Sequence, residues 1–137
     1  MNNYLKKSIL VYAAGLFTMT ASAQLSTNPD KFLGNITTGG QVDSGKEKFY
    51  QLWNQITCEN ETKWDATEPS QGNFTFSGGD RSANYAKQHG FPFKYHTLVW
   101  GAQYPSWMNN LSTDEHDKAL EEYFDGVKAH YPNLEIL

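Results

Sequence analysis

Polar side chains that could bind a sugar gather in two segments of the sequence. Glu59, Asn60 and Lys63 lie in the first segment, and His96 and Gln103 lie in the second. Together they supply hydrogen-bond donors and acceptors of mixed charge, which can contact ring hydroxyls at several angles. Tryptophan accompanies these groups, and its flat ring matches the apolar face of a pyranose; the platforms expected are Trp100 and Trp107. The two segments therefore predict a single cleft that binds carbohydrate.

A purely structural interpretation competes with this one. Taken alone, Glu59 is more often a solvated loop carboxylate and Lys63 an unspecific surface charge. The functional interpretation is favoured because both segments have the same layout, in which a short apolar run ends in polar residues and tryptophan. Two polar segments that follow neighbouring strands at one edge of a parallel sheet would face the same cleft.

Metal and thiol chemistry are not predicted. His89, His116 and His130 have no metal-ligand spacing relative to one another or to His96, and no cofactor is expected. Cys58 is the single cysteine, so the chain can form no internal disulfide. Cys58 is interpreted as part of an acidic loop without a nearby basic group, which disfavours a reactive thiolate.

The elements that must position the two segments are alternating strands and helices. Strands are expected at 32–37, 55–57 and 93–99, with 134–137 starting a fourth. A helix is expected where Phe49, Leu52, Trp53 and Ile56 follow helical spacing, and Gly39-Gly40 is expected to form the turn before it. The alternation favours a parallel α/β sheet with right-handed crossovers.

Two further helices have recognisable ends. Asp80 is expected to cap one helix, and Gly90 to end it in a left-handed conformation before the central strand. Ser112 and Glu115 form a capping box that opens the other, whose apolar stripe ends at 131–133; the stripe consists of Ala119, Leu120, Tyr123, Phe124 and Val127.

The amino terminus has the pattern of a secretory signal peptide over residues 1–23, with Lys6 and Lys7, an apolar run from Ile9 to Phe17, and Ala21-Ser22-Ala23 as the cleavage site. We therefore expect a secreted or periplasmic protein without a membrane anchor. Its formal charge would change from −4 to −6 on loss of the two lysines, which argues against a nucleic-acid partner. The oligomeric state is not indicated.

Several motifs in order resemble glycoside hydrolase family 10, the retaining endo-β-1,4-xylanases. They begin with Thr57-x-Glu59-Asn60-x-x-Lys63-Trp64 and Asp65-Ala66-Thr67-Glu68-Pro69, and continue with His96-Thr97-Leu98-Val99-Trp100, Gln103 and Pro105-Ser106-Trp107. The resemblance covers roughly residues 31–137. It implies a (β/α)₈ TIM barrel of which the first three to four βα units are present, because a complete barrel needs about 250 residues.

The resemblance also implies roles for single residues. Positions matching Glu59, Asn60 and Lys63 bind the sugar on the non-reducing side of the cut, and those matching His96 and Trp100 contact the sugar being cleaved. Gln103 adds a hydroxyl contact. Trp64 is expected to pack beneath these groups. Gly101 stands where many members have a second histidine, and Cys58 replaces a frequent proline.

Neither catalytic carboxylate is expected in this chain. Retaining glycosidases need an acid/base and a nucleophile about 5–5.5 Å apart, which family 10 places at the ends of strands four and seven. Three hypotheses remain open: the glycone-binding part of a secreted endo-xylanase acting on xylan or xylo-oligosaccharides, a non-catalytic secreted carbohydrate-binding protein, and a partial barrel that serves only in assembly. The chain is expected to be cut rather than finished, and to expose an unpaired strand edge.

Overall fold

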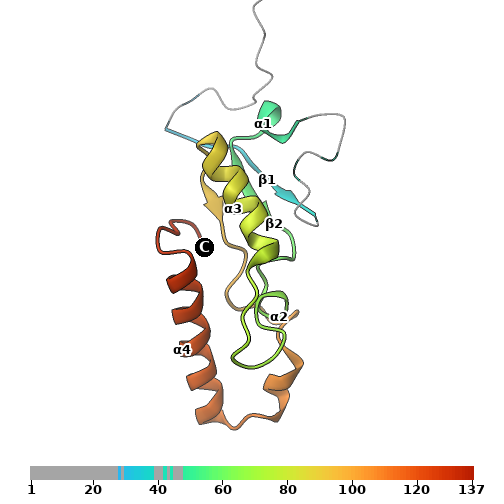
Figure 1. The fold of residues 1–137 in the computed structure, drawn as a ribbon, viewed down its shortest axis with the longest axis vertical. Coiled ribbons are helices and arrows are strands. Elements are labelled where there is room, and N and C mark those ends of the chain that lie inside the picture. The colour runs from blue at the N-terminus through green and yellow to red at the C-terminus, as the bar shows by residue number, and fades with distance from the viewer. Residues whose placement is uncertain (1–27, 29, 39–41, 43, 45–47) are drawn as a thin grey trace, which may run out of the picture.

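The computed structural model describes residues 28, 30–38, 42, 44 and 48–137 (Figure 1). The expected signal peptide at 1–23 and the Gly39-Gly40 turn lie outside these residues. The elements run in the order β1 (Gly34–Thr37), α1 (Phe49–Leu52), β2 (Gln55–Cys58), α2 (Trp64–Thr67), α3 (Ser77–His89), β3 (Phe93–Lys94), the 3-10 helix η1 (Ser106–Asn110) and α4 (Thr113–His130). Among the described residues, no helix is long and apolar enough to cross a membrane.

The sheet is parallel and its strands follow chain order, β1-β2-β3. Gly34 pairs with Gln55 at one end of the first ladder, and Ile56 pairs with Phe93 in the second. The expected fourth strand is represented by a parallel bridge between Lys94 and Ile136. This arrangement confirms the predicted parallel α/β sheet.

The two long helices end much as the sequence indicates. The backbone amide of Ser112 and its hydroxyl both donate to the Glu115 carboxylate, at 2.8 and 2.7 Å, so the predicted capping box opens α4. Gly90 has a φ of 69°, the left-handed conformation expected after α3. The prediction that Asp80 caps α3 is wrong, because the helix begins at Ser77 and Asp80 lies inside its first turn.

Two other expected elements are shorter than predicted. The helix near Phe49 ends at Leu52, and Ile56 belongs to β2, because the apolar spacing that suggested one helix spans two elements. β3 ends at Lys94, and Val99 is 53% exposed, so the strand expected over 93–99 stops early. The chain after Tyr95 instead forms the loop that carries the polar groups.

Aromatic side chains form the larger core cluster. Trp64 stacks on Tyr123 with ring centroids 4.5 Å apart, and the Tyr123 hydroxyl lies 3.0 Å from that of Tyr95. Tyr95 also lies 3.2 Å from the Thr67 hydroxyl, so the buried phenol groups all have hydrogen-bond partners. This cluster joins α2, α4 and the segment after β3, and α4 is seen beside α2 and α3 in Figure 1.

A smaller cluster lies between α3 and the sheet. Phe49, Ile56, Tyr85 and Ala86 pack together there, which explains the burial of β2 on its helix-covered side. The α4 stripe is buried at Ala119, Tyr123 and Val127, whereas Phe124 is 42% exposed and does not belong to the core. The two clusters fix β2 and β3, from whose carboxyl ends the polar segments emerge.

Candidate functional site

The loop that follows β2 sets the position of the first polar group. The amide of Glu59 donates to the Thr37 carbonyl at 3.0 Å, which continues the β1–β2 ladder by one residue. The chain then turns, and the Lys63 amide donates to the Asn60 carbonyl at 3.1 Å. Lys63 is the N-cap residue of α2, so this turn places Asn60 and Lys63 on one side of the loop.

Asn60 is the centre of the polar cluster. Its Oδ1 accepts a hydrogen bond from Lys63 Nζ at 3.0 Å and another from Gln103 Nε2 at 3.1 Å. Lys63 Nζ also lies 4.8 Å from the centroid of the Trp100 ring, a cation–π distance. The structure thus brings together four of the six predicted site residues, from segments that are about 40 positions apart in the sequence.

Gln103 is held by its backbone as well as its side chain. Its carbonyl accepts from the Asp65 amide at 3.4 Å, and its φ of 52° lies in the left-handed region. This conformation is uncommon for a residue other than glycine. Here the backbone bond to Asp65 and the side-chain bond to Asn60 both hold Gln103 in place. The loop that carries Trp100 is therefore tied to the start of α2. Trp100 itself is 51% exposed, so part of its ring is accessible to a ligand.

His96 follows β3 at the same end of the sheet. Its carbonyl accepts from Thr62 Oγ1 at 2.6 Å, which links the two polar segments below the cluster. Partial burial lowers the pKa of His96, and the positive charges of Lys63 and Lys94 lower it further. The imidazole is therefore neutral at pH 7 and offers one donor and one acceptor. Thr62 was not anticipated from the sequence.

Glu59 and His96 share this end of the sheet with the cluster. Glu59 is half-buried, and among the described residues neither its carboxylate nor the His96 ring forms a hydrogen bond to the four clustered side chains. The two groups flank the cluster, one after β2 and one after β3. All six predicted site residues therefore follow carboxyl ends of strands, where parallel α/β folds bind ligands.

Two tryptophans support the site from below. Trp64 is 3% exposed and packs in the core, as expected. Trp107 is not an open platform, because it is half-buried, meets Trp64 edge to face and donates from Nε1 to the Glu68 carbonyl at 3.1 Å. Trp107 therefore stabilises the loop rather than facing the cleft.

Glu68 is a supporting residue that the sequence analysis missed. Its side chain is buried, and its carboxylate accepts from Trp64 Nε1 at 2.8 Å and from the Gly72 amide at 2.7 Å. These bonds compensate a buried carboxylate and hold α2 against the following turn. The spacing of Trp64 and Glu68, one helical turn apart, is the signal that could have revealed the pair.

Cys58 and the remaining histidines take no part in this cleft. Cys58 ends β2 and is completely buried, not in an acidic loop, and burial raises the pKa of its thiol to about 11. His116 bonds the Met108 carbonyl and His130 bonds Asp80, each away from the polar cluster. The described residues contain no group of three or more His, Cys, Asp or Glu side chains that could hold a metal ion.

These features define a class of protein: a parallel α/β fold whose strands present a mixed polar and aromatic cleft at their carboxyl ends. Comparison with known families then gives the particular one. Residues 22–136 match the model of Glycosyl hydrolase family 10, and this chain belongs to that family.

Individual relatives agree with this assignment. Endo-1,4-beta-xylanase B from Cellvibrio japonicus is 45% identical over 107 residues, which are 78% of this chain and 17% of that protein. A Thermobacillus composti GH10 xylanase structure is 34% identical with a TM-score of 0.63, covering 71% of this chain and 32% of that one. Xylanase 10B from Thermotoga petrophila, solved in complex with xylobiose, has a TM-score of 0.65 at 23% identity, covers 73% and 33%, and shows the fold alone.

The chain spans about a third or less of the length of the curated relatives it matches. Its parallel sheet and helices superimpose on part of the fold found in family 10 xylanases.

Proposed function

We propose that this chain forms the part of an endo-1,4-β-xylanase that binds the sugar chain on the non-reducing side of the cleaved bond. The observation that carries the proposal is the convergence of Lys63 and Gln103 on Asn60 Oδ1 beside the half-exposed ring of Trp100. A charged donor, amides and a flat ring form a surface suited to the hydroxyl edge and apolar face of a xylose unit.

The proposed roles of single residues are those that the resemblance to family 10 implies. Glu59, Asn60 and Lys63 contact the sugar on the non-reducing side, and His96 and Trp100 contact the sugar being cleaved. Because both acceptor positions of Asn60 Oδ1 are occupied, its amide nitrogen is the group left to face the ligand. The neutral His96 ring can donate or accept without placing a second positive charge beside Lys63. Gln103 adds a further contact.

We further propose that the 137 residues alone bind xylo-oligosaccharides without hydrolysing them. Hydrolysis with retention needs both an acid/base and a nucleophilic carboxylate, and family 10 supplies them from strands four and seven. The signal-peptide pattern at residues 1–23 supports export of the protein. Outside the cytoplasm the protein could meet xylan.

Calorimetric titration of the full chain with xylotetraose tests the proposal. Saturable binding is expected, with at least tenfold weaker binding in Asn60→Ala and no binding of comparable strength to mannotetraose. Glu121→Ala, on the exposed side of α4, is the control and is expected to bind as wild type. Equal affinity in Asn60→Ala and wild type would reject the proposed cleft.

A hydrolysis assay separates the remaining hypotheses. The chain alone is expected to release no reducing sugar from xylan above background. The same chain extended by the following codons of its gene is expected to hydrolyse xylan if an Asn-Glu pair completes the strand that begins near Ile136. An extension without catalytic glutamates that still binds xylotetraose would favour a carbohydrate-binding protein.

A further inference from the structure

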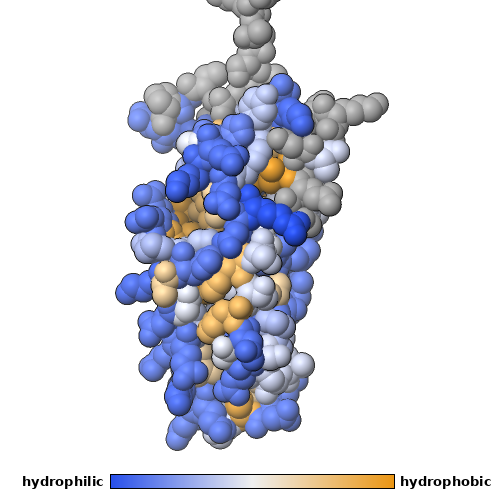
Figure 2. Space-filling view, viewed as in Figure 1, coloured by the Kyte–Doolittle hydropathy of each residue, from blue (hydrophilic) through white to orange (hydrophobic). Residues whose placement is uncertain are grey.

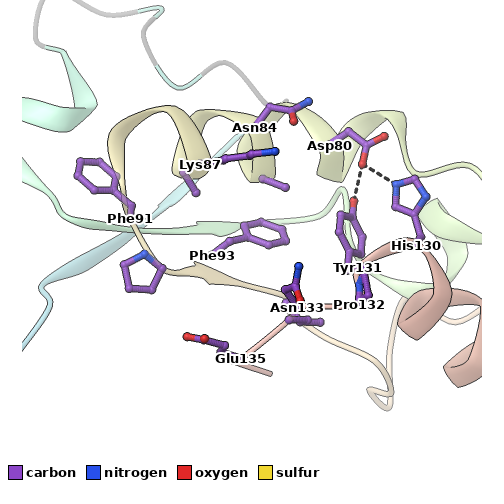
Figure 3. Close-up of a pocket in the computed structure, with 14 residues that line it drawn as sticks. Asp80, Asn84, Lys87, Phe91, Phe93, His130, Tyr131, Pro132, Asn133 and Glu135 are labelled. Atoms are coloured by element: carbon purple, nitrogen blue, oxygen red, sulfur yellow. Dashed lines mark hydrogen bonds and ion pairs between the residues drawn. The ribbon is translucent and has the colours of Figure 1, made fainter.

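A second cavity lies at the opposite ends of the strands from the cleft. It has a volume of about 710 Å³ and is formed between α3, the start of β3 and the segment that follows α4 (Figure 3). This volume falls within the range of small-molecule sites, about 300–1,000 Å³. Phe93 begins β3 here, whereas His96 and the polar cluster come after the carboxyl end of this strand.

The floor of the cavity is apolar. It includes Phe91, Phe93 and Leu134, and Figure 3 shows the Phe93 ring between Lys87 on one side and Asn133 on the other. Figure 2 shows apolar residues at the bottom of a hollow bordered by hydrophilic ones on this face of the molecule. An apolar floor with a polar border is the arrangement that binds a ligand with one apolar face.

The border carries hydrogen-bonding groups that are available to a ligand. Asn84 and Lys87 come from α3, and Asn133 and Glu135 come from the segment after α4. Among the described residues, the side chains of these four have no hydrogen-bond or ion-pair partner. They provide two amides, one cation and one carboxylate, which together can donate to and accept from several hydroxyls.

The charges at the border do not favour a ligand of one sign. Lys87 and Glu135 have opposite charges, so neither an anion nor a cation would find a consistent field. The other carboxylate, Asp80, already accepts at Oδ1 from His130 at 2.7 Å and from Tyr131 at 3.0 Å. A neutral polyhydroxylated ligand with an apolar face fits both the floor and the border.

We propose that this cavity is a second saccharide-binding site, which takes xylo-oligosaccharides or a xylan chain end independently of the cleft. The choice of xylose units rests on the function proposed above. A second contact with the same polysaccharide would raise the effective concentration of xylan at the cleft.

Titration of the full chain with xylotriose, followed by backbone amide NMR shifts, tests the site. Amides near Phe93 and Asn133 are expected to shift with one apparent Kd, and those near Asn60 and Gln103 with another. The double variant Asn84→Ala/Lys87→Ala is expected to weaken the cavity response at least tenfold and to leave the cleft response unchanged. Trp100→Ala is expected to have the reverse effect.

Lys118→Ala is the matched control, because Lys118 is an exposed lysine on α4 that pairs with Glu122 and does not line the cavity. It is expected to leave both responses unchanged. Cavity amides that do not shift at saturation of the cleft would overturn the inference while leaving the proposed function intact. Cavity shifts that persist with the same Kd in the Asn84→Ala/Lys87→Ala variant would also overturn it. Loss of the cleft response alone would count against the proposed function.

Discussion

Lys63 and Trp64 are neighbours in the sequence and serve opposite parts of the molecule. Lys63 directs Nζ to Asn60 and Trp100 at the cleft, whereas Trp64 stacks on Tyr123 in the core. The cleft is held by a few polar contacts beside an exposed ring, and the core by packed aromatic side chains. At the start of α2, one residue therefore contributes to ligand binding and the next to stability. Substitutions of Lys63 and of Trp64 should have different effects.

Removing the buried ring should have the largest effect. Trp64→Ala is expected to lower the free energy of unfolding by about 3–5 kcal/mol, because it empties a buried site and removes the partner of Glu68. Trp100→Ala, which truncates an exposed ring, is expected to change it by less than about 0.5 kcal/mol. Urea unfolding followed by circular dichroism measures both, and equal losses would contradict the separation.

Removing the cleft cation should act on binding instead. Lys63→Ala is expected to weaken xylotetraose binding by about 1.5–3 kcal/mol, the cost of losing a charged hydrogen bond. Its loss of unfolding free energy should be smaller than that of Trp64→Ala. Calorimetry measures the first quantity and urea unfolding the second. Unchanged affinity in this variant would mean that Lys63 only supports the loop.

Stability at alkaline pH tests the residue that joins the core to the cleft loop. This residue is Cys58, which is buried directly before Glu59. The folded thiol has a pKa of about 11 against 9.0 for the free group, so the unfolded chain loses this proton first. Stability should therefore fall as pH rises from 9 to 11, by at most about 3 kcal/mol from this group. Urea unfolding at several pH values measures the slope.

Cys58→Ala is the reference for that slope. The tyrosines whose pKa burial raises, among them Tyr95 and Tyr123, titrate in both proteins, so the difference between the two slopes isolates the thiol. Identical slopes in wild type and variant would show that Cys58 is solvated rather than buried.

A small effect on stability, with none on binding, is expected far from both regions, at the start of α4. Ser112→Ala removes the hydroxyl of the capping box and should cost about 1 kcal/mol of unfolding free energy. Xylotetraose binding should not change. The capping bonds lower the pKa of Glu115, so their contribution is present above the pKa of the unfolded carboxyl and is lost as pH falls through the folded value. Thermal unfolding at pH 7 and pH 3 measures this loss.

The sequence predicted features that depend on local chemistry. The Ser112–Glu115 box and the left-handed Gly90 are confirmed, because each needs only neighbouring residues. The parallel order of the strands is confirmed, because helices between strands leave few alternatives. The proximity of Asn60, Lys63 and Gln103 agrees with the expectation that strand ends converge.

Features that depend on tertiary packing could not be predicted in the same way. Ile56 fits both a helical period from Phe49 and a strand, and only its pairing with Phe93 decides between them. Trp107 has the flat ring expected of a sugar-binding platform. Its indole instead donates to the Glu68 carbonyl, 39 residues away in the sequence. Their roles followed from residues that lie far apart along the chain.

The order of the strands in the sheet has a consequence for biosynthesis. β1, β2 and β3 lie side by side in the order in which they are synthesised, so each strand finds its neighbour already present. Pairing of β1 with β2 requires no residue beyond Cys58, and β3 joins once Lys94 has emerged. The sheet can therefore assemble vectorially, one strand at a time, as successive strands become available along the chain.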